Sequence, residues 1–391
     1  MAIYHPKKPQ YNRWGTFISI ATRIIFPPIL LWDLLKFATN RLIGEAVGGF
    51  ILKAQHIDFS DRYINHTQTL NNQETHLHHA LHTVITHDGS KLDTLEITHK
   101  SQQLIPMGQQ KYIINFVGNS TVYENIVADM QADAKALHCH VIGFNFRGVG
   151  RSSGRSTSKD DLVTDGITQV QQLLEQGVSP HNITLKGHSL GASIASLVAY
   201  HFHQQCQPIN LFNGRSFSSI TNIVVGWIRT GRQTGHEETF GRKLLGWLFK
   251  PFIKLALLLT KWEIDADDAF KAIPDEHKEY VVVRTPRQER NRYVLDDVII
   301  PHYASIHLAL KDERRAKKAA LAGNIQALTE IKTLFNERKM ENTDLYEENG
   351  HQVGLRHLVN RSGKTALAFF REFVQRTHEH HAIHIETSLT I

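Results

Sequence analysis

The chain has 391 residues, of which 41% are hydrophobic and 21% charged, and it contains two cysteines. This composition is typical of a globular protein with a substantial core, in one large or two small domains, and it excludes a fold held together by disulfides. The formal net charge of +6 comes from scattered lysines and arginines, without the dense basic stripe that nucleic-acid binding favours. We therefore expect no nucleic-acid partner, whereas a basic balance with apolar helices suits an anionic membrane surface.

The most apolar stretch of the chain lies near its N-terminus, at residues 15–53. Arg23 interrupts it and Pro27 and Pro28 follow, so it lacks the about 20 consecutive apolar residues that a transmembrane helix needs. The position of Arg23 and the missing cleavage site also argue against a secretory signal. Three interpretations of the segment 1–79 stay open: helices packed on the main domain, an interfacial membrane anchor, and a true span.

From about residue 80 the sequence alternates between predicted strands and helices. Two strands, at 83–86 and 92–97, flank the turn sequence His87–Ser90 and predict a hairpin. Because strands and helices continue to alternate at regular spacing, we expect right-handed crossovers and a largely parallel sheet. The elements expected next are a strand at 111–117, a helix at 124–137, a strand at 141–146, a helix at 165–175 and a strand at 183–186.

The five residues from Gly187 to Gly191 fit the pattern G-x-S-x-G. In this pattern a sharp turn between a strand and a helix presents a serine, and small residues on either side let the neighbouring backbone pass. The required order is present, because a strand precedes the turn and a small-residue helix at 192–200 follows it. We therefore predict that Ser189 is a nucleophile, held in an elbow with Gly187, His188 and Gly191.

After a strand at 209–214 the regular alternation breaks. A strongly apolar helix with lysines at intervals is expected at 243–259, in a region where caps or lids are commonly inserted. Alternation resumes with a strand at 280–284, and a helix at 361–376 precedes a polar, histidine-rich tail. The predicted division is an N-terminal apolar helical segment (1–79), a first core part (80–220), a helical cap (221–275), a second core part (276–378) and a tail (379–391).

A serine hydroxyl becomes a good nucleophile when a histidine takes its proton, and that histidine needs an acid to hold its tautomer. After an elbow of this kind the acid follows a late strand, and the histidine lies near the C-terminus. Asp297 is the predicted acid because its spacing to Pro301 fits a D-x-x-x-P pattern, and Asp296 is the alternative. His351 is the predicted base because it lies in a polar loop before the last helix, whereas His357 is expected to pack with its apolar neighbours.

The tetrahedral intermediate of such a reaction needs backbone N–H donors for its oxyanion. Leu190 is predicted to supply one donor, because it directly follows the nucleophile at the start of a helix. Asn119, in the loop after the strand at 111–117, is predicted to supply the other, and Gly118 would allow the close approach of that loop.

Histidine is frequent in this chain, with 25 copies, and it clusters at residues 76–82 and 378–384. Neither cluster has cysteine partners or the H-E-x-x-H spacing of a zinc hydrolase. We expect a solvated strand edge at the first cluster and a frayed C-terminal tail at the second, and we predict no metal and no cofactor.

Over residues 80–375 the chain resembles the α/β-hydrolase superfamily. The resemblance rests on the elbow at 187–191, the loop Asn145–Ser152, Asp297 with Pro301, and the pair Gly350-His351. It implies an α/β fold with a mostly parallel central sheet flanked by helices, a helical cap insertion and an N-terminal helical segment.

Three short segments, at 116–120, 215–219 and 297–306, also resemble the lipase-like SidB group of type IV secretion effectors from Legionella-type bacteria. This resemblance implies delivery into a host cell by a type IV system and action in the cytoplasm or at a membrane. Two positions depart from the pattern of related enzymes. Ala192 stands where many lipases carry a second glycine, and Val117 stands where many relatives place the histidine of an oxyanion loop.

The predicted function is that of a serine ester hydrolase, of the lipase, esterase or phospholipase type, working through an acyl-enzyme on Ser189. The expected substrate is a lipid or a small acyl ester, with a membrane surface as partner. The same triad serves acyltransferases and thioesterases, and a membrane- or protein-docking module with little turnover is a further alternative. The acyl chain and the oligomeric state stay open.

Overall fold

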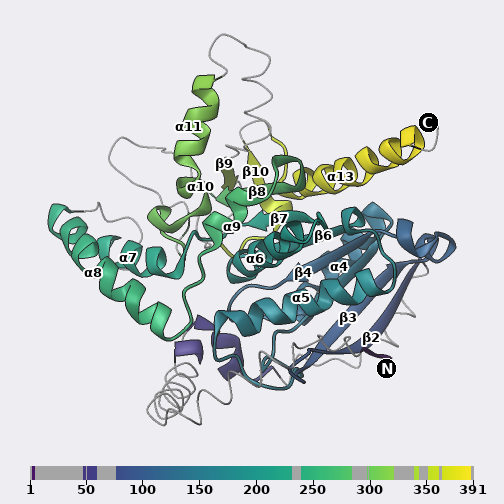
Figure 1. The fold of residues 1–391 in the computed structure, drawn as a ribbon, viewed down its shortest axis with the longest axis horizontal. Helices are drawn as coiled ribbons and strands as arrows, with labels where there is room; N and C mark the ends of the chain where they lie inside the picture. Colours follow the sequence, from purple (N-terminus) through teal and green to yellow (C-terminus); the bar gives the residue numbers. More distant parts are fainter. Residues whose placement is uncertain are drawn as a thin grey trace, which may run out of the picture.

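A computed structural model of the chain describes residues 2–4, 47–49, 51–59, 76–230, 239–283, 297, 299–320, 339–342, 351–360 and 363–388. Most of the N-terminal segment, the alternative acid Asp296 and Gly350 lie outside these residues. Within them, a ten-stranded sheet carries helices on both of its faces (Figure 1). The predicted α/β architecture with a mostly parallel sheet is therefore confirmed.

The strands lie in the order β1-β2-β3-β5-β4-β6-β7-β8-β9-β10 across the sheet. The run from β5 to β9 is parallel, whereas β3 pairs antiparallel with β2 and β5, and β10 with β9. Because the carboxyl ends of parallel strands meet at one edge, the loops after β4, β6, β7 and β8 come together there. The strands are β1 (Ala2–Tyr4), β2 (Leu77–Ile85), β3 (Lys91–His99), β4 (Tyr112–Phe116), β5 (His140–Phe144), β6 (Ile183–His188), β7 (Asn210–Gly214), β8 (Lys278–Val283), β9 (Lys339–Asn342) and β10 (Leu358–Asn360).

Two apolar cores lie on the two faces of the sheet, because successive side chains of a strand point to opposite faces. Ile114 of β4 packs in the core under α5, α6 and α9, and its neighbour Ile113 packs in the core under α4 and α13. Leu211 and Phe212 of β7 divide between the cores in the same way. The described helices are α4 (Val127–Leu137), α5 (Lys159–Glu175), α6 (Leu190–Gln204), α7 (Ile220–Thr230), α8 (Phe240–Leu259), α9 (Ala266–Ala272), α10 (Ile306–Ala309), α11 (Lys311–Ala320) and α13 (Ala366–Ser388).

Both histidine clusters differ from their predicted surroundings. The first lies on β2, which pairs with β1 and β3, and His79 is only 2% exposed, with its Nε2 3.2 Å from Gln131 Nε2. The second lies on α13, which continues to Ser388 instead of ending near Arg376. His378 is buried there, and this burial, with the charge of Lys111 second, lowers its pKa to about 3. The predictions of a solvated edge and a frayed tail are therefore wrong for His79 and His378.

The expected helical insertion contains α7, α8 and α9, and α8 begins three residues before the predicted helix. α7 and α8 form a pair that extends from the body on the side opposite β2 and β3 (Figure 1). None of the helices in the described part of the chain is long and apolar enough to cross a bilayer. The apolar stretch at 15–53, for which a span was one interpretation, lies largely outside the described residues.

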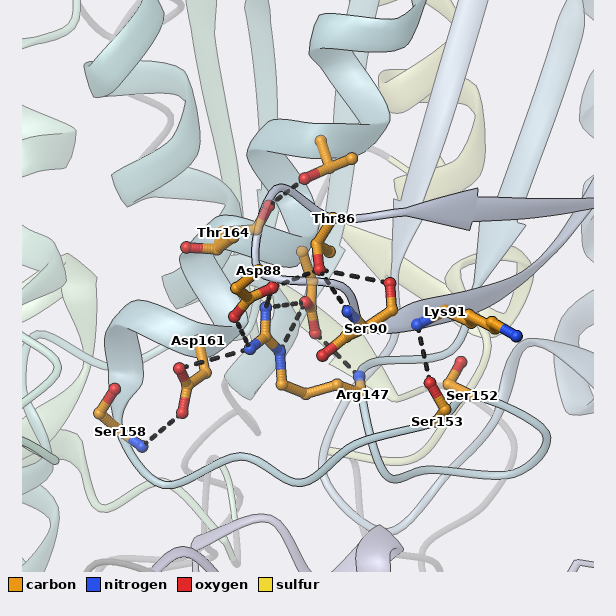
Figure 2. Close-up of polar contacts among 12 residues, drawn as sticks. Thr86, Asp88, Ser90, Lys91, Arg147, Ser152, Ser153, Ser158, Asp161 and Thr164 are labelled. Atoms are coloured by element: carbon orange, nitrogen blue, oxygen red, sulfur yellow. Dashed lines mark hydrogen bonds and ion pairs between the residues drawn. The ribbon is translucent and has the colours of Figure 1, made fainter. Parts of the chain in front are cut away.

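A buried arginine joins three separate segments beside the sheet (Figure 2). Arg147 follows β5, and its Nε and backbone N–H each donate to the carboxylate of Asp165 on α5 at 2.8 Å. Its Nη1 reaches Asp88 in the β2–β3 turn at 2.5 Å and Asp161 in the first turn of α5 at 3.4 Å. A planar guanidinium with several donors can hold these carboxylates at once, and a lysine could not. Arg147 therefore fixes the β2–β3 turn against the loop after β5.

We expect Arg147→Met to lower the free energy of unfolding by about 3–5 kcal/mol, because the fully buried Asp165 carboxylate loses its cationic partner. Urea denaturation measures this change. Asp160→Asn, at an exposed position in the first turn of α5, is the matched control and should cost less than about 1 kcal/mol. Equal effects of the two substitutions would show that the Arg147 contacts do not stabilise the fold.

Candidate active site

Ser189 lies at the sharp turn between β6 and α6, at the carboxyl edge of the sheet. Its backbone has φ +54° and ψ −122°, a conformation that side chains other than glycine rarely adopt. The backbone N–H of Ser189 donates to the carbonyl of Gly214 at the end of β7, at 2.8 Å. The neighbouring strand thus holds the strained turn in place.

The two glycines of the elbow pattern are required by close backbone contacts. A Cβ atom on Gly187 would lie 2.3 Å from the Cα of Ala192, and one on Gly191 would lie 2.2 Å from the carbonyl oxygen of Phe116. Neither contact can relax without moving α6 or β4. Ala192, where many lipases have glycine, packs its own methyl group against the position of Gly187.

Three residues from distant parts of the chain form one hydrogen-bond chain at this edge. The Nε2 of His351 lies 2.8 Å from the Oγ of Ser189, and its Nδ1 lies 2.7 Å from the Oδ2 of Asp297. The Oδ1 of Asp297 accepts the backbone N–H groups of Ile299 and Ile300, each at 2.8 Å. Both oxygens of the carboxylate are therefore fixed, and Ser189 and His351 are buried.

This geometry selects one tautomer of His351. Since a carboxylate only accepts hydrogen bonds, Nδ1 of His351 carries the proton and donates it to Asp297. Nε2 is then left to accept the hydroxyl proton of Ser189. The arrangement can move a proton from the serine to the histidine while the aspartate stabilises the resulting imidazolium.

His188, the variable residue before the serine, lies beside the base, with ring centroids of His188 and His351 4.9 Å apart. Desolvation first, and the charges of Arg215 and His351 second, lower the pKa of His188 well below its usual range. His188 therefore stays neutral at physiological pH and adds no positive charge of its own beside His351.

Arg215 is a residue of this site whose role sequence reasoning missed. It directly follows β7, has φ +53°, and is only 6% exposed. Its Nη1 donates to the carbonyl of Val353, two residues after His351. Desolvation lowers its pKa to about 10, against the opposing charge of Asp297. Arg215 therefore stays charged and holds the loop that carries His351.

The loop after β4 passes directly beside the nucleophile. A Cβ atom on Gly118 would lie 3.0 Å from the Cδ2 of His188 and 3.4 Å from the Cβ of Ser189, so a side chain there would crowd His188. The next residue, Asn119, is held by its side chain, whose Oδ1 accepts the backbone N–H of Lys53 at 2.8 Å. Leu190 is the first residue of α6 and is buried. Both predicted oxyanion donors therefore belong to segments that flank the elbow.

A cavity of about 240 Å³ lies next to the elbow. Its walls come from the ends of β4, β6 and β7 and from the loop after His351, and they include Gly118, His188, Arg215 and Val353. The cavity lies beside Gly187 and His188, and Ser189, His351 and Asp297 are not among its lining residues.

Two further predictions concern His357 and the absence of a metal. His357, expected to pack with apolar neighbours, is exposed on a short helix after the base, so that prediction is wrong. The expected absence of a metal stays a prediction. Within the described residues, Asp265, Asp267 and Asp268 bring carboxylate oxygens within 4.8 Å of one another, and burial first, then Asp267, raises the pKa of Asp265 to about 6.

Comparison with known proteins gives one family match. Residues 116–247, which include the elbow, match the α/β hydrolase fold family. No curated protein sequence matches the chain. Similar solved structures include an α/β hydrolase from Vibrio vulnificus, with 18% identity, 61% of this chain and 74% of that chain covered, and a TM-score of 0.42. An esterase from Pyrococcus furiosus has 16% identity, coverages of 62% and 78%, and a TM-score of 0.39. An acetyl xylan esterase from Paenibacillus sp. R4 has 13% identity, with 55% of this chain and 75% of that chain covered, and a TM-score of 0.35.

Proposed function

Because the chain has the α/β-hydrolase fold, we propose that it is a serine ester hydrolase that works through an acyl-enzyme on Ser189. One observation carries this proposal: the continuous hydrogen-bond chain from the Oγ of Ser189 through His351 to Asp297. A serine without such partners is a poor nucleophile, and a buried histidine held at both ring nitrogens activates it.

In the proposed reaction the Oγ of Ser189 attacks the ester carbonyl carbon as His351 takes the hydroxyl proton at Nε2. The backbone N–H groups of Leu190 and Asn119 stabilise the oxyanion that develops. His351 then donates its proton to the leaving alcohol oxygen, which breaks the ester bond and leaves an acyl group on Ser189. Water, deprotonated by the same nitrogen, attacks the acyl-enzyme, and His351 then returns the proton to the Oγ of Ser189 as the bond to the acyl carbon breaks and the carboxylic acid leaves.

The proposed substrate is an acyl ester of a lipid. The support for this choice is the exposed apolar surface of α8, which would bring the enzyme to an interface where such esters reside. Acyl transfer or thioester cleavage would use the same acyl-enzyme and differ only in donor or acceptor. A docking module with little turnover would not need an aligned triad, so the geometry favours an enzyme.

The resemblance to SidB-type effectors rests on the three short segments alone, and the comparisons reported above add no support to it. Delivery into a host cell by a type IV system therefore stays a proposal that follows from those segments. Secretion of a tagged full-length chain by a strain with and without a functional type IV apparatus would test it.

A fluorophosphonate probe tests the proposed chemistry directly, because it phosphonylates serines that a neighbouring base has activated. We expect the intact protein to take up one probe per chain, and peptide mapping to place the adduct on Ser189. Adducts on other serines only, or no reaction in a folded preparation, would contradict the proposal. Prior acylation by a substrate ester should slow the labelling.

A further inference from the structure

α8 carries an apolar surface that the rest of the described chain leaves exposed. Trp247 is 71% exposed and Phe252 is 68% exposed, although both are large apolar side chains on a well-formed helix. A contiguous apolar patch of this kind on a soluble protein marks an interaction site. Its members are Phe240, Leu244, Leu245, Trp247, Leu248, Phe249, Phe252, Leu255, Leu258 and Leu259.

The charge of the same segment is entirely positive. Residues 240–261 contain five cationic side chains and no aspartate or glutamate, and α7 adds Arg229 without an acidic residue. An anionic partner is therefore favoured over a neutral or cationic one. The cations of the segment are Arg242, Lys243, Lys250, Lys254 and Lys261.

The distribution of these side chains fits a lipid surface. α8 has 20 residues and is about 30 Å long, yet its lysines recur along its length and Pro251 lies inside it. Such a helix lies in the plane of a bilayer, with its apolar side chains among the acyl chains and its lysines reaching the headgroups. Each lysine near an anionic surface adds about 1 kcal/mol.

α7 joins this surface to the loop that carries the acid of the triad. The Nε1 of Trp227 donates to the carbonyl of Ile299 at 3.2 Å, two residues after Asp297. The guanidinium of Arg229 lies 4.1 Å from the ring centroid of Tyr303, and the Nζ of Lys250 on α8 lies 3.3 Å from the hydroxyl of the same tyrosine.

The contact between α7 and this loop is close. A Cβ atom on Gly226 would lie 2.8 Å from the Cβ of Pro301, so the backbone of α7 lies against the loop. The α7–α8 pair therefore rests directly on the active-site edge of the sheet and not on a remote surface.

We propose that the α7–α8 pair is an interfacial docking surface for an anionic lipid bilayer, with α8 lying in the plane of the headgroups. This inference deepens the proposed function, since it names where the lipid ester comes from. Docking itself does not require catalysis, and the two can fail separately. A second copy of the chain or a protein partner on α8 is an alternative outcome of the test.

Co-sedimentation of the full-length protein with vesicles tests the proposal. We expect binding to vesicles of equimolar phosphatidylcholine and phosphatidylserine, and a drop of about tenfold or more in the partition coefficient for the double variant Trp247→Glu, Phe252→Glu. Leu104→Glu is the matched control, because Leu104 is 90% exposed at the end of a short helix after β3. The control should bind like the wild type.

Charge neutralisation separates the electrostatic part of the binding. Lys254→Gln with Lys261→Gln should weaken binding to the phosphatidylserine vesicles by about fivefold per lysine, and leave binding to pure phosphatidylcholine unchanged. High salt should reproduce the effect in the wild type.

Unchanged vesicle binding in the double variant would overturn the proposal. If the wild type does not bind vesicles but forms a dimer, and the double variant is a monomer, α8 would instead be assigned to contact with a second copy of the chain. Fluorophosphonate labelling of Ser189 and hydrolysis of a soluble short-chain ester should persist in the double variant. If the wild type binds vesicles through α8 but never labels, the proposed function fails while the docking surface stands.

Discussion

Ser189→Ala should lower kcat for a soluble short-chain ester by about 10⁶-fold, the size of effect that removal of a triad serine produces. The variant lacks the only atom of the hydrogen-bond chain that can form the acyl-enzyme. It should also lose fluorophosphonate labelling. We expect little change in melting temperature, because alanine occupies the strained elbow about as well as serine and the hydroxyl bonds only His351 among the contacts described.

Ser193→Ala is the matched control for this variant. Ser193 lies one turn further along α6 and is buried, and its Oγ donates to the carbonyl of Phe217 at 3.3 Å rather than to the base. Its removal should leave labelling and turnover nearly unchanged. Hydrolysis by Ser189→Ala at the wild-type rate would place the chemistry on another residue and refute the acyl-enzyme at the elbow.

Asp297→Asn should lower kcat/KM by about 10⁴-fold, the loss measured when a triad aspartate becomes asparagine. Asparagine keeps the shape of the side chain, and its oxygen can still accept the N–H groups of Ile299 and Ile300. Its NH₂ group then faces the Nδ1 of His351 and forces the proton onto Nε2. Nε2 can no longer accept the proton of Ser189, so the nucleophile stays inactive although the fold is intact.

Asp296→Asn is the control for this second prediction, since Asp296 was the alternative acid and lies outside the described residues. It should be close to wild type in steady-state hydrolysis of the same ester. A severe defect in Asp296→Asn combined with a mild one in Asp297→Asn would move the acid by one residue along the chain.

The elbow could be predicted from sequence because its requirements are local. Glycine is needed at 187 and 191 because a Cβ atom there would lie 2.2–2.3 Å from neighbouring backbone atoms, and a strand–turn–helix of this geometry creates these close approaches. The proximity of Asp297 and His351 to Ser189 could be predicted because parallel strands bring successive loops to one edge of the sheet, which limits the candidates to residues after late strands. The distances of 2.8 and 2.7 Å along Ser189, His351 and Asp297 agree with that expectation.

What could not be predicted depends on contacts between distant segments. His79 is buried because α4 lies against it, with the Nε2 of Gln131 3.2 Å from its ring, and this contact is not visible in the alternation of β2. The sequence marks Arg215 only as part of the segment 215–219, and its contact with the carbonyl of Val353, 138 positions away, is not visible there. The position of an arginine at the carboxyl end of β7, on the same edge as the elbow, is the one signal that could have marked it.

The bond between Trp227 and the carbonyl of Ile299 has a thermodynamic consequence. A free-energy coupling between two sites is reciprocal: if binding at one site favours the state that binds the other, the reverse holds by the same factor. Ile299 donates its backbone N–H to the carboxylate of Asp297, and its carbonyl accepts the indole N–H of Trp227 on α7. If docking of the α7–α8 pair favours an ordered loop at Asp297, an ordered loop must favour docking by the same factor. In that case, an inhibitor that bridges Ser189 and His351 and orders this loop would raise the affinity of α8 for the bilayer.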